Sequence, residues 1–192
     1  MQPTRDQAWE TLTKYTKSEA LLRHALAVEA GVRAYAAKYG EDEELWSAVA
    51  LLHDFDYEIH PTLDQHPQDG APILREEEYP EELVEAVLSH AQHLGRPRDT
   101  QLKKALFACD ELAGFVHACG LVRPDGIDTL EPKSVRKKLK QASFAAGVNR
   151  DDVYQGAEEL GVDLDEHIRF VIEAMRPIAP QLGLRTAATT SA

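Results

Sequence analysis

The sequence contains very little cysteine and no long apolar run. Its 192 residues include two cysteines, Cys109 and Cys119, and no CxxC motif. Both lie in an apolar segment, so we expect reduced thiols in the core of a cytoplasmic protein. No segment approaches the roughly 18 apolar residues that cross a bilayer. The residues from Met1 to Asp6 lack the apolar stretch of a secretory signal peptide.

Basic residues are also scarce. The chain has 21 lysines and arginines against 33 aspartates and glutamates, which gives a formal net charge of -12. This deficit argues against sequence-independent binding to duplex nucleic acid, which requires a basic surface, and against adhesion to anionic membranes. Hydrophobic residues make up 43% of the chain, which is enough for the core of one domain of ordinary size. Nothing in the sequence specifies an oligomeric state.

Apolar residues recur at helical spacing through most of the chain, and no segment shows the period of two that is typical of a strand. Gly40 is placed to end one strongly periodic helix, and Pro80 is placed to begin another. We therefore predict one all-α domain of roughly seven or eight helices over residues 1–184, followed by a disordered tail at residues 185–192. The predicted helices span residues 18–38, 42–53, 69–77, 80–93, 101–119, 134–146, 150–160 and 164–175.

One pair of polar residues stands at the end of an apolar helix. His53 and Asp54 directly follow the run from Ala48 to Leu52, after which the sequence turns polar. Burial of a histidine and an aspartate without a partner is costly. A bound metal ion is the simplest partner for both, because neutral imidazole and carboxylate are common metal ligands.

Two further polar residues lie on apolar helix faces. His24 precedes Val28 by four residues, and Asp110 follows Leu106 by four. Each alone has a structural explanation as a hydrogen-bonded core residue, although an aspartate is rarely buried unless it is paired. Together with the doublet they place two histidines and two aspartates on three inward faces, which favours one shared site.

The order His24, His53-Asp54, Asp110 resembles the H…HD…D motif of the HD-domain superfamily of metal-dependent phosphohydrolases. The resemblance covers residues 20–120, and the segments LLHDFDY and ACDEL around the motif residues are typical of that superfamily. It implies an all-α fold, in agreement with the periodicity, and it implies that these four residues hold a divalent metal ion. It does not distinguish Mn, Fe, Co, Ni, Zn or Mg, because histidine and carboxylate sets accept several ions.

Two more histidines extend the resemblance to a second ion. The segment from His66 to Leu74 is similar to the HPxxGaxIL stretch of HD-GYP phosphodiesterases, and His90 falls on the apolar face of its helix. In HD proteins with two metals, histidines at such places ligate the second ion, which makes His66 and His90 metal-ligand candidates. Their structural alternatives are a loop residue and a core histidine. The GYP signature is absent, so a cyclic-dinucleotide substrate is not implied.

A phosphohydrolase also needs groups that transfer protons. Asp56 and Glu58 follow the doublet by two and four residues, and we predict that they act as the catalytic acid or base. The alternative for Asp56 is a structural role in capping the loop.

A basic segment in this acidic chain provides a candidate phosphate-binding face. No acidic residue occurs from residue 133 to residue 150. We predict that one helix face in this segment binds a substrate phosphate near the metal, the alternative being a solvated face that pairs with acidic neighbours. The residues at three- and four-residue spacing on that face are Lys133, Arg136, Lys137 and Lys140.

These observations predict a metal-dependent phosphohydrolase that acts on a small phosphorylated metabolite or nucleotide through a metal-activated water. Two alternatives use the same residues. The first is a di-iron HD-domain oxygenase acting on a small substrate, because such proteins also carry extra histidines. The second is a non-catalytic metal-binding regulatory module, against which the presence of all four core ligands argues.

Overall fold

The computed structural model describes residues 3–185 and has the predicted all-α fold. Within these residues it contains nine α-helices, two single-turn 3₁₀ helices and no strand. The α-helices are α1 (Arg5–Tyr15), α2 (Glu19–Tyr39), α3 (Glu43–Leu52), α4 (Gly70–Glu76), α5 (Glu81–His90), α6 (Gln101–Leu121), α7 (Pro132–Leu139), α8 (Arg150–Leu160) and α9 (Leu164–Met175).

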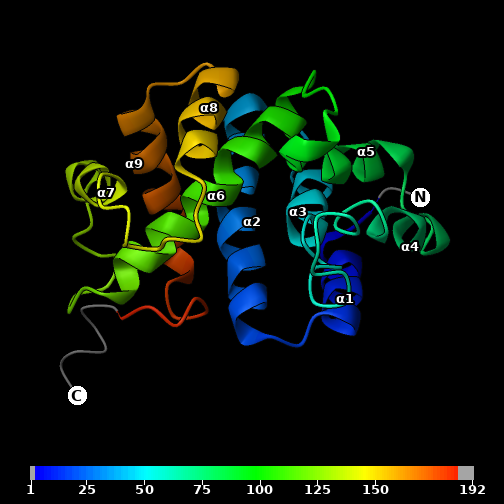
Figure 1. Cartoon of the computed structure of the whole chain (residues 1–192), viewed down its shortest axis with the longest axis horizontal. Coiled ribbons are helices and arrows are strands. Elements are labelled where there is room, and N and C mark those ends of the chain that lie inside the picture. Colours follow the sequence, from blue (N-terminus) through cyan, green and yellow to red (C-terminus); the bar gives the residue numbers. More distant parts are fainter. Residues whose placement is uncertain (1–2, 186–192) are drawn as a thin grey trace.

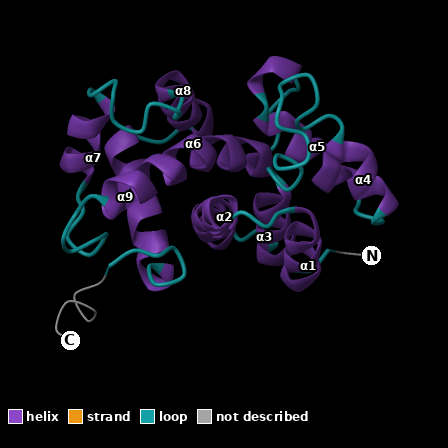
Figure 2. Cartoon of the chain, turned by 60° about the horizontal axis from the view of Figure 1, so that its bottom comes forward, coloured by secondary structure: helices purple, strands orange, loops and turns teal. Residues whose placement is uncertain are grey.

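Helix α2 lies at the centre of the molecule (Figure 1). It packs against α3, α6 and α9, and α6 in turn packs against α5 and α8. Figure 1 shows α1, α3, α4 and α5 on one side of α2, and α7, α8 and α9 on the other. Figure 2 looks nearly along α2, with α6 lying across it. Helices α2 and α6 therefore connect the two halves of the bundle.

Glycines let α6 approach its neighbours closely. A Cβ at Gly31 of α2 would lie 3.0 Å from Sγ of Cys109, and a Cβ at Gly156 of α8 would lie 2.6 Å from Cα of Ala108. A larger side chain at Gly156 would push α8 away from the backbone of α6. Both contacts involve residues within two positions of Asp110, so this close packing sets the position at which Asp110 projects from α6.

A buried histidine joins α2, α6 and α9. His167 is fully buried, its Nδ1 lies 2.7 Å from the hydroxyl of Tyr35, and its Nε2 lies 2.9 Å from the carbonyl oxygen of Ala108. Because a carbonyl only accepts, Nε2 carries the proton and Nδ1 accepts from Tyr35. Burial lowers the pKa of His167 to about 4, so the ring is neutral at pH 7.

Helix α3 carries the His53-Asp54 doublet into the core. The side chain of Asp42 caps the first turn by accepting hydrogen bonds from the backbone N–H groups of Glu44 and Leu45, at 2.9 and 3.1 Å. Every residue from Leu45 to Leu52 is buried, and His53 follows as the C-cap. The chain then enters turns, so the doublet stands at the inner end of α3.

The helix predicted at residues 134–146 is shorter than expected. Helix α7 ends at Leu139, and turns follow, with Ala145 at a φ of 44°. The guanidinium of Arg150 donates hydrogen bonds to the carbonyl oxygens of Ala145 and Val148, both at 2.7 Å, and to that of Phe144. These carbonyls are satisfied by a side chain, so the turns are stable without a continuing helix.

Helix α1 was not among the predicted helices. Only Ala8, Thr11 and Leu12 of its eleven residues are buried. A face with so few buried residues gives only a weak apolar period in the sequence. The sequence does carry a start signal, since Thr4 and Gln7 form a reciprocal capping box. That motif, rather than hydrophobic spacing, would have identified the helix.

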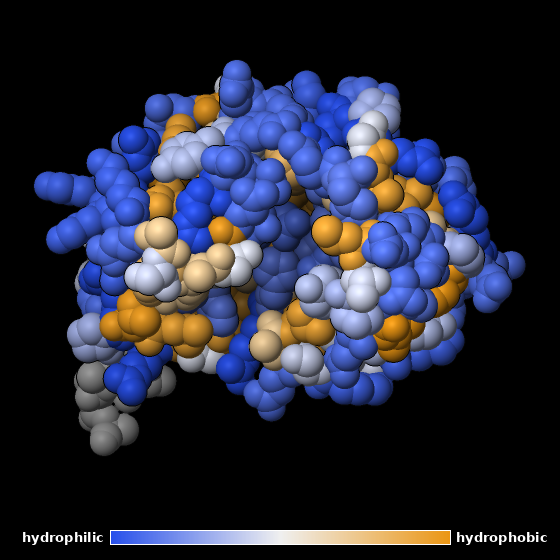
Figure 3. All heavy atoms as spheres, viewed as in Figure 1, coloured by the Kyte–Doolittle hydropathy of each residue, from blue (hydrophilic) through white to orange (hydrophobic). Residues whose placement is uncertain are grey.

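The remaining predictions about organisation concern thiols, the tail and membranes. Cys109 and Cys119 are buried and free, as expected for core thiols. The predicted disordered tail falls, apart from Arg185, outside the described residues. Within residues 3–185 no helix combines the length and apolar content required to cross a membrane. The face drawn in Figure 3 is largely hydrophilic and is hollowed near its middle.

Candidate metal centre

Three separate parts of the chain bring the four motif residues together. His24 comes from α2, His53 and Asp54 from the end of α3, and Asp110 from the middle of α6. The Nε2 atom of His24 lies 3.2 Å from Nε2 of His53 and 3.1 Å from Oδ1 of Asp110. The Oδ2 atom of Asp54 lies 3.7 Å from Nε2 of His24 and 3.5 Å from Nε2 of His53. The four predicted ligands therefore form one cluster.

A second group lies on the other side of Asp54. Its Oδ1 atom is 3.1 Å from Nε2 of His66 and 3.3 Å from Nε2 of His90. The two Nε2 atoms are 3.3 Å apart. The two carboxylate oxygens of Asp54 thus face different histidine pairs, and the groups His24, His53, Asp54 and Asp54, His66, His90 each have the spacing to hold an ion.

Hydrogen bonds at Nδ1 orient three of the rings. His53 donates to the carbonyl of Ala50 at 2.7 Å, and His90 donates to the carbonyl of Val87 at 2.6 Å. His66 has a different partner, the Oδ1 atom of Asp56, at 2.8 Å. A proton on Nδ1 leaves Nε2 of a neutral ring as a bare lone pair, which is the form that binds metals.

This donor set fits a divalent cation. In the neutral rings of His53 and His90 the Nε2 lone pairs point at other imidazole nitrogens 3.2 and 3.3 Å away. A cation or a proton shared between the nitrogens would relieve such contacts, and Asp54 and Asp110 supply negative charge beside them. The four imidazoles and two carboxylates are ligands that Mn, Fe, Co, Ni and Zn all accept.

The carboxylates draw positive charge to the cluster. Burial lowers the pKa of His53, but the charges of Asp54 and Asp110 outweigh it and raise that pKa to about 10. Burial likewise lowers the pKa of His66, but its hydrogen bonds to Asp54 and Asp56 raise it to about 9. Burial raises the pKa of Asp110, but the charge of His53 and hydrogen bonds from both histidines of its group lower it overall. The carboxylates of the cluster therefore favour the binding of cations, whether protons or metal ions.

The cluster opens into a cavity of about 600 Å³. Its lining contains four carboxylates but no lysine or arginine. Beyond the metal-ligand candidates, the lining residues are Leu21, Tyr57, Leu63, Ala91, Gln92, His93, Phe107, Glu111, Asn149 and Asp152. A small molecule can therefore reach the cluster between partly apolar walls.

Neither Asp56 nor Glu58 lines this cavity. Asp56 is fully buried and faces His66, while the Oε2 atom of Glu58 accepts backbone N–H groups of Lys17 and Ser18 at 2.8 and 2.9 Å. A proton-transfer group must reach the reacting atoms, and the structure places neither carboxylate in the cavity. Glu58 instead caps the loop that joins α1 and α2.

The basic face also lies away from the cluster. Helix α7 packs against α9 and α6, and none of Lys133, Arg136, Lys137 and Lys140 lines the metal-centre cavity. Lys137 borders a separate cavity of about 240 Å³, and Arg136 pairs with Asp165 at 3.3 Å. The structure thus places the predicted phosphate-binding residues apart from the metal-centre cavity, because tertiary packing turns α7 to another part of the molecule.

Sequence reasoning did not assign Glu111, Asn149 and Asp152 to the site. Glu111 directly follows Asp110, lines the cavity and accepts the backbone N–H of Asn149 at 3.1 Å. Burial and then the charge of Asp110 raise the pKa of Glu111 to about 7. Asn149 and Asp152 come from the start of α8, and no local signal connects them to the motif.

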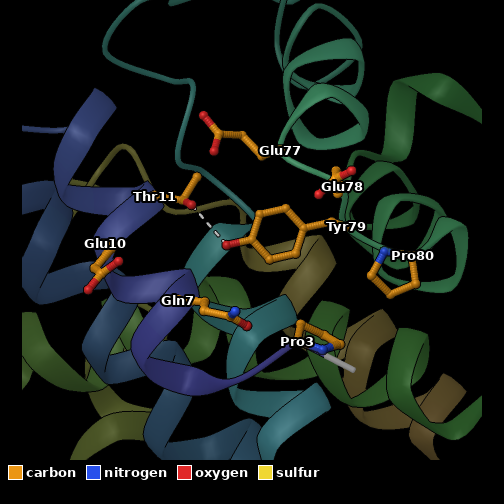
Figure 4. A pocket seen from close by; sticks show the side chains of 8 residues that line it. All are labelled: Pro3, Gln7, Glu10, Thr11, Glu77, Glu78, Tyr79 and Pro80. Carbon is orange, nitrogen blue, oxygen red and sulfur yellow. Dashed lines mark hydrogen bonds between the residues drawn. The ribbon is translucent and has the colours of Figure 1, made fainter. Parts of the chain in front are cut away.

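A further cavity, of about 380 Å³, lies between α1 and the segment that joins α4 to α5 (Figure 4). The hydroxyls of Thr11 and Tyr79 meet inside it at 2.9 Å. The side chains of Glu10, Glu77 and Glu78 also border it (Figure 4). No histidine lines it, so this cavity lacks the chemistry of the metal centre.

Comparison with known families agrees with this geometry. The family model described as the HD domain matches residues 21–114, a span that contains all six metal-ligand candidates. Residues 21–114 therefore carry the HD domain, a domain that belongs in general to metal-dependent phosphohydrolases. No solved structure gave a significant match.

Proposed function

We propose that the protein is a metal-dependent phosphohydrolase that cleaves a phosphate ester or anhydride of a small metabolite or nucleotide. One observation carries the proposal. The two oxygens of Asp54 face two histidine pairs at the floor of an open cavity, inside an HD domain. His24, His53, Asp54 and Asp110 would hold one divalent ion, and Asp54, His66 and His90 would hold a second.

Bound divalent ions would polarise a phosphoryl oxygen of the substrate and would lower the pKa of a bound water towards neutrality. The protein supplies orientation and proton transfer. Tyr57, Leu63 and Phe107 form apolar walls for the organic part of the substrate. Glu111 is the carboxylate of the cavity best placed for proton transfer, because it lies beside Asp110 without belonging to either metal-ligand group.

One observation favours a second candidate, a di-iron oxygenase that acts on a small substrate. Among the described residues the cavity has no lysine or arginine in its lining, so neither of these side chains is available to neutralise a phosphate. A centre with four histidines and a carboxylate that faces both positions suits a pair of irons as well as a pair of hydrolytic ions. A non-catalytic metal-binding module is the third candidate, and the open cavity argues against it.

Elemental analysis and a substrate screen separate these functions. Protein purified without oxygen is analysed for metals, and then assayed on phosphomonoesters, phosphodiesters and nucleotides with Mg²⁺, Mn²⁺, Co²⁺, Ni²⁺ or Zn²⁺. We expect metal-dependent release of phosphate. Two irons per chain together with substrate-dependent oxygen uptake would instead establish the oxygenase, and bound metal with neither activity would favour the regulatory module.

The variants His53→Ala and Asp54→Ala test whether the cluster is responsible. Each should lose most of its bound metal and its activity, because each removes a ligand from the shared centre. Asp64→Ala is the matched control, since Asp64 is an exposed aspartate in the loop that follows. Metal content and activity that survive both cluster substitutions would refute the site.

A further inference from the structure

Asp56 has one side-chain partner and no access to solvent. Its exposed fraction is 0%, and its Oδ1 atom accepts the Nδ1 proton of His66 at 2.8 Å. Its Oδ2 atom is buried and has no hydrogen-bond partner among the described residues. A Cβ at Gly70 would lie 2.6 Å from that oxygen, so the glycine makes the space that the carboxylate occupies. The packing thus confines the Asp56 carboxylate, and its one side-chain hydrogen bond among the described residues is with His66.

This arrangement is costly for the fold alone. A buried carboxylate with an unpaired oxygen forfeits hydration that no protein contact restores. The rings of His53 and His90 are oriented by backbone carbonyls instead, which shows that a neutral acceptor suffices for orientation. A carboxylate at His66 adds negative charge behind the ring, and such charge makes Nε2 a stronger donor to a metal.

We propose that Asp56 is a positioning residue that holds His66 and strengthens it as a ligand of the second metal ion. The inference rests on the proposed function, because it concerns the same centre. His66 lies between two carboxylates, with Nδ1 on Asp56 and Nε2 3.1 Å from Oδ1 of Asp54. Asp56 therefore acts on the position formed by Asp54, His66 and His90, and leaves the position at His24 and Asp110 unchanged.

The test is Asp56→Asn, which keeps the shape and the accepting oxygen but removes the charge. Metal-free protein is titrated with Co²⁺, and the visible absorption bands of the bound ion report each binding step. We expect two ions per wild-type chain. In the variant the first ion should bind within about threefold of wild type, while the second should bind roughly 10- to 100-fold more weakly. His66→Ala should bind one ion only.

Asp64→Asn is the matched control and should bind both ions as wild type does. Equal affinity of Asp56→Asn and wild type for the second ion overturns the proposal, and so does a wild-type chain that binds fewer than two ions. If Asp56→Asn does not fold, the ¹⁵N shifts of His66 in the Zn²⁺-loaded wild type decide the matter. A protonated Nδ1 is expected, and a bare Nδ1 overturns the proposal.

The two proposals fail in different ways. A wild-type protein that binds two ions but hydrolyses no phosphate substrate contradicts the proposed hydrolase, whereas the Co²⁺ titration still decides the role of Asp56. Hydrolysis that persists with an unchanged second-ion affinity in Asp56→Asn contradicts the positioning role alone.

Discussion

At the scale of single residues, the site depends on side chains that carry two polar atoms, each with a different partner. Asp54 directs one oxygen to His24 and the other to His66 and His90, so one carboxylate serves both groups. His66 binds Asp56 through one nitrogen and faces the cluster with the other. His66 is buried, and this burial strengthens its electrostatic interactions with the two carboxylates.

The residue-scale prediction concerns Glu111. Glu111→Gln removes a carboxylate that borders the cavity, directly follows Asp110 in the chain and lies outside both metal-ligand groups. We expect kcat to fall by roughly 10²- to 10⁴-fold with metal content unchanged, because proton transfer is lost while the ligands remain. Steady-state kinetics and elemental analysis measure both quantities. Glu158→Gln, an exposed position on α8, serves as the control, and an undiminished kcat in Glu111→Gln would assign the role elsewhere.

At the scale of helices, the buried link from Tyr35 through His167 to Ala108 holds α2, α9 and α6 in register. The carbonyl of Ala108 lies two residues before Asp110, so this link also supports the segment that carries a metal-ligand candidate. It is a fully satisfied polar network, which specifies one packing of the three helices more strictly than apolar contacts do.

This link predicts how stability depends on pH. The pKa of His167 is about 4 in the folded state and about 6.5 for an exposed histidine, so the unfolded chain binds the proton more tightly. Its contribution to stability is therefore present above pH 6.5 and is lost as the pH falls towards 4. Between pH 7.5 and 5 the loss from this residue should be roughly 2 kcal/mol.

Urea unfolding of the wild type and His167→Gln at both pH values measures this effect. Glutamine does not titrate, and its amide can reach the same partners. The pH-dependent loss should be smaller in the variant by roughly 2 kcal/mol. Every other titratable group is common to both proteins, so the contribution of the rest of the chain cancels. Equal losses in the two proteins would show that His167 does not remain neutral in the fold.

At the scale of the whole molecule, the metal centre joins segments that are distant in sequence. Its ligand candidates come from α2, the end of α3, the loop before α4, the end of α5 and the middle of α6, which lie far apart along the chain. In an unfolded chain these groups cannot converge, and an ion that binds only the folded state stabilises the fold by mass action.

Removal of metal should therefore destabilise the protein. At a free metal concentration of about 100 times Kd, binding contributes about 2.7 kcal/mol, which corresponds to a shift in Tm of roughly 5–10 °C for a chain of this size. Thermal unfolding with and without a chelator measures the shift. Asp54→Ala should show little shift, since it lacks the shared ligand. An equal shift in wild type and variant would mean that the metal binds elsewhere.

Much of the fold and part of the site could be predicted from the sequence. Helical periodicity located eight of the nine helices in the described chain, because their apolar faces repeat every three to four residues. The polar helix α1 has few buried residues and was missed. Helix α7 was predicted too long, because the guanidinium of Arg150 satisfies the carbonyls of the segment that follows it, and hydrophobic spacing carries no trace of that contact.

The sequence by itself determined the helical class and most candidates of the metal centre, because a histidine or aspartate on an apolar face is visible in local spacing. His66 lies in a loop and was identified by its resemblance to the HPxxGaxIL stretch. Only the tertiary structure decided which way these side chains face. It turned Asp56 towards His66, brought Glu111 and the start of α8 to the cavity, and carried the basic face of α7 away from it. Those outcomes depend on how helices pack across the core, and packing between distant segments leaves no periodic signal in either segment alone.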